Sequence, residues 1–251
     1  MRLFLRLALA GTLAVASAWP ASAFDAGQKD EIGAIVRDYL LQHPEVLLDA
    51  QRELQRRQEA KLEEQRKGAL RDYVAKIDAS KLHAVLGDPK GDVTLVEFFD
   101  YNCGYCRRAI RDIDALLAAD PKLRIVLMEL PVIRQESLGA AQVSVAVSRT
   151  APDKFRAFHE KLLSGQSLAT KKTALAAAKE VGLDPAKIEA AMNGAEVRAT
   201  LLESKELADE LGVEATPTFV IGDAVVPNTT SVVDDLQGRI AALRTCGKSV
   251  C

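Results

Sequence analysis

Residues 93–106 read VTLVEFFDYNCGYC, and this stretch decides the fold. Its first half, residues 93–99, is apolar almost throughout, which is typical of a strand that is buried on both faces. A helical pattern begins at Cys103 and continues to about residue 119. A second apolar strand is predicted for residues 123–132. Together these segments form a βαβ unit, so we expect the two strands to be parallel.

Cys103 and Cys106 lie where the first strand ends and the helix begins. A thiolate at a helix N-terminus is stabilised by the unpaired backbone N–H groups and by the positive end of the helix dipole. Cys103 is therefore predicted to have a lowered pKa and to act as a nucleophile. Cys106, one turn further along, is predicted to attack the resulting mixed disulfide and release the substrate.

Two other interpretations of this cysteine pair are a purely structural disulfide and half of a metal site. A zinc site needs two further Cys or His ligands. His43, His83 and His159 are scattered along the chain without ligand spacing, and we expect each to be an ordinary surface or capping histidine. The position of the pair in a βαβ unit favours a redox role, with no metal and no other cofactor.

The rest of the chain extends this βαβ unit. The pattern is helical over residues 135–211, which we predict to be an inserted helical block. Strands return at residues 218–221 and 224–226, with the tight-turn signal Gly222-Asp223 between them. A last helix is predicted over residues 232–243. The predicted fold class is α/β.

The first 23 residues predict a signal peptide that is cleaved after Ala23, so the mature chain is expected in the periplasm. Arg2 and Arg6 form a basic start, and the apolar run over residues 7–18 is too short to span a bilayer. The alternative is an uncleaved membrane anchor. The formal net charge of −2, without a clustered basic excess, argues against a nucleic-acid partner.

Residues 24–82 are predicted to form a helical arm and linker. Residues 28–42 carry apolar side chains at helical spacing, and His43-Pro44 separates them from a second helix. Residues 52–67 are almost entirely charged, which favours a solvent-exposed rod between two packed units. The apolar stripe of such short helices must be buried, either against copies of the chain or against its own second domain. We expect the first option, an oligomerisation arm.

Cys246 and Cys251 bring the cysteine count to four, and an even count in an oxidising compartment indicates disulfides. Four cysteines allow three pairings, and the two close spacings favour Cys103 with Cys106 and Cys246 with Cys251. We expect the second pair to be a structural disulfide that pins the tail after the last helix. The alternative is a second pair that exchanges electrons.

The segment over residues 96–106 resembles the active-site segment of DsbA-like proteins with a thioredoxin-like fold. The resemblance covers about residues 85–243, including the inserted helical domain. Ala-Thr-Pro-Thr-Phe at residues 215–219 is similar to the superfamily segment in which a cis-proline faces the catalytic cysteines. The resemblance therefore implies that Pro217 is this cis-proline and that Thr216 presents its backbone to substrate. The alternative for Pro217 is an ordinary trans turn proline.

The resemblance also implies a role for Glu97, which lies on an otherwise apolar strand. At the matching position the family has a buried acid beneath the active site, which could relay protons for Cys106 or tune its pKa. The alternative is a glutamate that points to the sheet edge. Gly104-Tyr105 and Thr216 are similar to the isomerase DsbC, whereas a DsbA-type oxidase has Pro-His between its cysteines and Val before the cis-proline.

A long helical extension before an exported DsbA-like domain resembles the suppressor-of-copper-sensitivity C proteins (ScsC), some of which are trimers with isomerase activity. The resemblance implies a homotrimeric disulfide isomerase or reductase that acts on misfolded or oxidised exported proteins. An isomerase must be kept reduced, so a membrane reductase of the DsbD type is the expected electron donor.

Three alternatives remain: a monomeric dithiol oxidase, a copper-handling protein that binds Cu(I) through two thiolates, and a non-catalytic scaffold. The expected domain organisation is a signal peptide (residues 1–23), the helical arm and linker (24–82) and a DsbA-like thioredoxin domain (83–251). Within that domain the helical insertion is expected over residues 135–211.

Overall fold

The computed structural model divides the chain into two compact units, Met1–Arg57 and Gln58–Cys251. It describes residues 25–227 and 232–251. The signal peptide predicted for residues 1–23 lies outside the described residues. Within the described ranges, none of the helices combines the length and the apolar character that a bilayer span requires.

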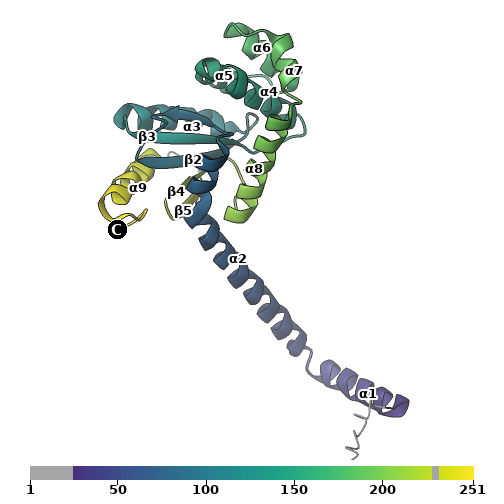
Figure 1. Ribbon diagram of the computed structural model, residues 1–251. Coiled ribbons are helices and arrows are strands. Elements are labelled where there is room, and N and C mark those ends of the chain that lie inside the picture. Colours follow the sequence, from purple (N-terminus) through teal and green to yellow (C-terminus); the bar gives the residue numbers. More distant parts are fainter. Residues whose placement is uncertain (1–24, 228–231) are drawn as a thin grey trace, which may run out of the picture. The chain divides into compact units, whose positions relative to one another are not determined.

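The first unit consists of helix α1 (Ala26–Gln42) and the beginning of helix α2 (Glu45–Ser80) (Figure 1). Asp25 and Gln28 form a capping box that satisfies free N–H groups at the start of α1. No residue of α1 is buried, and its apolar side chains include Ile35, 63% exposed, and Tyr39, 53% exposed. The predicted apolar stripe is thus present, and its side chains are exposed within the first unit.

Helix α2 is one continuous helix of 36 residues, charged segment included. Ion pairs at helical spacing support that segment, among them Glu53 with both Arg56 and Arg57. The helix changes character at its C-terminal end, where Tyr73 and Ile77 are buried in the second unit. Residues 58–80 therefore belong to the second unit, whereas the sequence places the domain boundary at residue 82.

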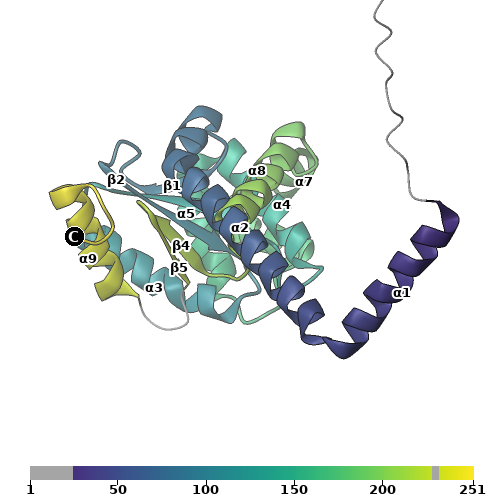
Figure 2. The same cartoon turned by 90° about the horizontal axis from the view of Figure 1, so that it is seen from below.

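The second unit contains a five-stranded sheet in the order β1-β3-β2-β4-β5. Figure 2 shows β4 and β5 next to each other in this sheet. β2 and β3 are parallel, as predicted for the βαβ unit, and the other three neighbouring pairs are antiparallel. The edge strand β1 was not predicted, because it has four residues, of which only Leu86 is buried. The strands are β1 (Ala84–Gly87), β2 (Val93–Phe99), β3 (Leu123–Glu129), β4 (Thr218–Ile221) and β5 (Ala224–Pro227).

The two faces of the sheet form separate cores, because successive side chains of a strand point to opposite faces. Val96 and Phe98 pack with the end of α2 and with α8 (Ala195–Leu211). Leu95 and Phe99 face the other side, where α3 (Gly104–Ala119) and α9 (Val233–Cys246) contribute the apolar partners. Glu97 and the cysteines of the 93–106 stretch belong to this second face.

Between β3 and β4 the chain forms the predicted helical insertion. Helix α4 lies at its centre and packs against each of the other four helices, so most of its residues are buried. The predicted fold class, an α/β thioredoxin-like fold with an inserted helical domain and an N-terminal helical arm, is confirmed. The insertion consists of α4 (Ser137–Thr150), α5 (Pro152–Ser164), α6 (Lys171–Glu180), α7 (Pro185–Ala191) and α8.

Candidate active site

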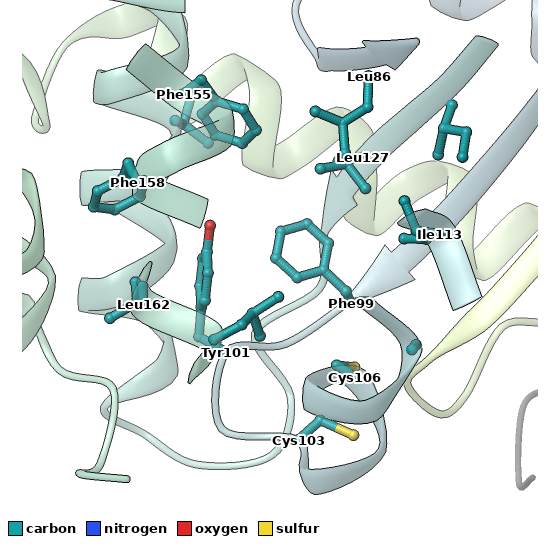
Figure 3. Close-up of a cluster of buried hydrophobic side chains, with 14 of the residues drawn as sticks. Leu86, Phe99, Tyr101, Cys103, Cys106, Ile113, Leu127, Phe155, Phe158 and Leu162 are labelled. Atoms are coloured by element: carbon teal, nitrogen blue, oxygen red, sulfur yellow. The ribbon is translucent and has the colours of Figure 1, made fainter. Parts of the chain in front are cut away.

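Cys103 is the N-cap residue of α3, and Cys106 lies in the first turn of the same helix (Figure 3). The strand β2 ends at Phe99, and a backbone hydrogen bond of 3.0 Å from Cys103 N to Asp100 O closes the short connection. Both cysteines are free thiols, and both are buried. The sequence thus folds locally so that the backbone N–H groups of α3 point toward the sulfur of Cys103.

The pKa values of the two thiols are shifted in opposite directions. The hydrogen bond from Cys106 lowers the pKa of Cys103 to about 5, against the effect of burial, with smaller contributions from the Thr216 side chain and from the backbone N–H groups of Tyr105 and Cys106. Burial raises the pKa of Cys106 far above its ordinary value, and the neighbouring Cys103 and Glu97 act in the same direction. At neutral pH this arrangement gives one thiolate and one thiol.

The segment before β4 lies against Cys103. The peptide bond between Thr216 and Pro217 is cis, and the Thr216 carbonyl accepts a hydrogen bond from the Cys103 thiol at 3.0 Å. Thr216 is buried, with 8% of its surface exposed, and its backbone carbonyl lies beside the sulfur. This carbonyl is a hydrogen-bond acceptor beside the reactive sulfur, and the backbone of an extended peptide could pair with it.

Glu97 lies in the middle of β2, between β3 and β4, with Leu127 and Phe219 as its strand partners. It is 2% exposed and lies on the inside of the sheet, away from the sheet edge. Burial raises the pKa of Glu97 to about 8, and the charges of Cys103 and Asp112 add to this effect. A buried carboxyl with a pKa near neutrality can take and return a proton.

Sequence reasoning missed a polar cluster on the same face of the sheet. The hydroxyl of Tyr101 contacts Ser144 Oγ at 2.8 Å and His159 Nδ1 at 2.9 Å. Tyr101 packs edge-on against Phe99 (Figure 3). His159 is 1% exposed, and burial lowers its pKa to about 3. The expectation of a surface or capping histidine is therefore wrong at this position, where the imidazole is a neutral partner inside the core.

A second buried acid, Glu129, ends strand β3 beside Phe99. Burial raises the pKa of Glu129 well above its ordinary value, and the charges of Asp100 and Glu97 act in the same direction. Its signal was similar to that of Glu97, a single acid that follows an apolar run, here residues 125–128. His83 also departs from the expectation of a surface histidine, since its side chain is 1% exposed and contacts Glu203 Oε1 at 3.0 Å.

Cys246 and Cys251 form a disulfide with a Cα–Cα distance of 6.3 Å at the C-terminal end of α9. The backbone N–H of Ser249, within the loop that they close, donates to Asp223 Oδ1 at 2.8 Å. The loop is thereby attached to the turn between β4 and β5. This pair is not part of the cluster around Cys103.

The structure thus brings five of the predicted site residues together and places the other two, Cys246 and Cys251, at the end of α9. Among residues 25–227 and 232–251, no group of three or more His, Cys, Asp or Glu side chains could hold a metal ion. Binding of Cu(I) by two thiolates alone stays a prediction. The five clustered residues are Cys103, Cys106, Glu97, Thr216 and Pro217.

Comparisons with known proteins match both parts of the chain. A family model described as Thioredoxin matches residues 79–241. A second model, described as Copper resistance protein ScsC N-terminal domain, matches residues 28–61.

Among solved structures, a thioredoxin-like oxidoreductase from Silicibacter pomeroyi DSS-3 is 40% identical, with a TM-score of 0.62, and the match covers 65% of this chain and 93% of that one. ScsC of Proteus mirabilis in a transitional conformation is 26% identical, with a TM-score of 0.59, and the match covers 86% of this chain and 94% of that one.

Two curated proteins also match part of the chain. The Na(+)/H(+) antiporter NhaA 1 of Salinispora arenicola is 28% identical over 152 residues, which are 60% of this chain and 23% of the antiporter. The chain therefore spans less than a quarter of the length of that relative. Disulfide bond formation protein D of Bacillus subtilis is 25% identical over 167 residues, which are 62% of this chain and 75% of that protein.

Proposed function

Since the chain belongs to the thioredoxin family, as a DsbA-like member of the ScsC kind, we propose that it is a thiol–disulfide oxidoreductase that works as a disulfide isomerase or reductase on exported proteins. The observation that carries the proposal is the Cys103 sulfur, which lies at the N-terminus of α3, beside the Thr216 carbonyl, with a pKa lowered to about 5 by the Cys106 hydrogen bond.

The proposed reaction begins when the Cys103 thiolate attacks a sulfur of a substrate disulfide. A mixed disulfide forms, the substrate S–S bond breaks, and the leaving thiolate takes a proton. Glu97, whose pKa of about 8 leaves about one molecule in ten ionised at pH 7, accepts the proton of Cys106 in that ionised form. The Cys106 thiolate then attacks the Cys103 sulfur, and the second substrate sulfur leaves as a thiolate and takes up this proton. The protein ends with a Cys103–Cys106 disulfide, and the substrate, reduced by two electrons, ends with two thiols.

The difference between the lowered pKa of Cys103 and the raised pKa of Cys106 favours isomerase or reductase chemistry. Because burial raises the pKa of Cys106, this thiol attacks only after it loses its proton. The mixed disulfide at Cys103 therefore persists long enough for another substrate thiol to attack it, which is rearrangement rather than reduction. Gly104-Tyr105 between the cysteines is consistent with the same proposal. The reduced pair would be restored by an external dithiol donor, which we propose is a membrane reductase of the DsbD type.

Exposed apolar side chains beside the site suit an unfolded substrate. Tyr105 lies between the cysteines and is 48% exposed, and Ile133 and Leu168 are also exposed. Hydrogen bonds place both residues near the cysteines. Ile133 N donates to the side chain of Asp100, and Ala169, the residue after Leu168, accepts from the side chain of Asn102. Misfolded proteins expose apolar segments that such side chains can contact.

The exposed apolar stripe of α1 supports a further part of the proposal, assembly through copies of the first unit, with a homotrimer as the expected state. Ile35 and Tyr39 lie four residues apart on one helix face, and the ScsC N-terminal model covers both positions. An assembly would place several Cys103 sites around one substrate. The periplasm, where such disulfides form, is the proposed location.

Reactivation of scrambled ribonuclease tests the proposal, measured beside oxidation of reduced ribonuclease. We expect reactivation that is lost in Cys103→Ser and little oxidation. The double variant Ile35→Glu and Tyr39→Glu should have a lower molar mass in light scattering and lower isomerase activity, whereas the exposed control Lys29→Glu should match the wild type. Oxidation without reactivation would indicate a dithiol oxidase, and an unchanged molar mass in the double variant would remove α1 as the assembly element.

A further inference from the structure

Asn102, the residue before Cys103, is bonded to the helical insertion through its side-chain amide. Its Nδ2 donates to Ala169 O at 2.8 Å and to Ser137 Oγ at 3.0 Å, and its Oδ1 accepts from Ala169 N at 2.7 Å. The amide thus pairs with both backbone groups of Ala169, as a neighbouring strand would. Only a side-chain amide offers a donor and an acceptor in this arrangement, whereas a carboxylate offers acceptors alone.

Arg107, the residue after Cys106, bonds to the same part of the insertion. Its Nη1 donates to Gly165 O, and its Nη2 donates to Ser167 O at 3.2 Å. The guanidinium is therefore directed to backbone carbonyls of residues 165–169. Arg107 and Asn102 lie on the two sides of the Cys103–Cys106 pair, so both ends of this short segment are attached to one loop.

The loop itself needs these partners. Residues 165–169 connect α5 to α6 without regular secondary structure, and Ala169 is 1% exposed. A buried backbone N–H and C=O in such a segment must find partners outside it. Those partners come from Asn102, while Leu168, one residue before Ala169, stays exposed beside the site.

We propose that Asn102 and Arg107 are positioning residues, which clamp residues 165–169 against both ends of the Cys103–Cys106 segment and so fix the N-terminus of α3 for attack by Cys103. The proposal rests on the proposed thiol–disulfide exchange. It assigns the helical insertion a part in the reactivity of the cysteines, since the N–H groups that stabilise the Cys103 thiolate belong to the segment that the clamp holds.

The test is the pH profile of Cys103 alkylation by iodoacetamide in the reduced full chain. The variants leave the charge unchanged: Asn102→Leu removes the hydrogen bonds to Ala169, and Arg107→Lys keeps the positive charge without the planar fork that reaches two carbonyls. We expect both profiles to move to higher pH, with labelling at pH 5 slower by about three-fold or more than in the wild type.

Two control variants lose a comparable hydrogen bond elsewhere. Arg149→Met removes a bond from Nη1 to Lys81 O at 2.8 Å, and Thr200→Val removes a bond from Oγ1 to Glu196 O at 2.8 Å. Both should keep the wild-type profile even if they unfold at a lower temperature. Wild-type profiles in Asn102→Leu and Arg107→Lys would overturn the clamp. An ordinary cysteine profile in the wild type itself would instead contradict the proposed function.

Discussion

The replacement Glu97→Gln should stabilise the fold and slow the chemistry at the same time. Glu97 is 2% exposed, and burial raises its pKa from an ordinary value of 4.5 to about 8. Between pH 4.5 and 8 the folded protein therefore holds a proton on Glu97 that the unfolded chain has lost. Folding stability accordingly falls as the pH rises through this window, because the folded state binds more protons than the unfolded state.

The size of the effect follows from the two pKa values of Glu97. Each pH unit above 4.5 costs the folded state about 1.4 kcal/mol, so the cost at pH 7 is about 3 kcal/mol. A glutamine is neutral at every pH and carries no such cost. We therefore compare the free energy of unfolding of Glu97→Gln with that of the wild type. The difference between the two proteins should be about 3 kcal/mol larger at pH 7 than at pH 4.

Urea unfolding of the reduced proteins at pH 4 and pH 7 measures this difference. Glu136→Gln, which changes an exposed glutamate, is the control and should show no such pH dependence. Turnover with a small disulfide should fall by about two orders of magnitude in Glu97→Gln, since Cys106 loses its proton acceptor. If the stability difference between Glu97→Gln and the wild type is the same at both pH values, Glu97 is not a buried acid with a raised pKa.

Three further changes test other parts of the structure. Replacing Cys246 and Cys251 by serine should lower the free energy of unfolding by about 2 kcal/mol, as expected for a short closed loop, and should leave turnover unchanged. A large loss of turnover would indicate a second exchanging pair. His159 gains a proton below pH 6.5 in the unfolded chain but only near pH 3 in the folded protein, so folding stability falls as the pH drops through this window, by about 2 kcal/mol at pH 5. His159→Phe should lose this dependence in urea unfolding, and an unchanged dependence would contradict a buried neutral imidazole. Gly222→Ala should lower the melting temperature, because Gly222 has a φ of +57° and the new Cβ would lie 2.6 Å from Leu243 Cδ2; an unchanged melting temperature would show that the turn adapts.

Segments with a strong local pattern could be predicted from the sequence. β2, α3 and β3 each follow an apolar pattern with a clear period or run, and their connections force the parallel pairing of β2 and β3. The edge strand β1 has no such pattern, because it pairs on one side only. Tyr73 and Ile77 restore an apolar stripe after the charged part of α2, and the structure buries both side chains. The sheet face that they meet could not be predicted, because the stripe does not specify its partner.

The same division holds for the site. Cys103 and Cys106 carry their chemistry in a local motif, and Glu97 is conspicuous as an acid among apolar neighbours. The partner of Asn102, by contrast, is the backbone of Ala169, which lies 67 residues away in the sequence. A backbone N–H or C=O has no signature in the amino-acid sequence, so contacts of this kind appear only in the folded structure.

The central claim, that Cys103 is the nucleophile of a thiol–disulfide oxidoreductase, is tested most directly by the pH dependence of its alkylation. The fully reduced protein is labelled briefly with iodoacetamide between pH 4 and 9, and mass spectrometry locates the label. With a pKa of about 5, Cys103 should be about nine-tenths thiolate at pH 6, where a free cysteine is less than about 1% thiolate. We expect half-maximal labelling of Cys103 near pH 5 with Cys106 unlabelled. Half-maximal labelling near pH 8.5, or equal labelling of both cysteines, would contradict the role of Cys103 as the nucleophile.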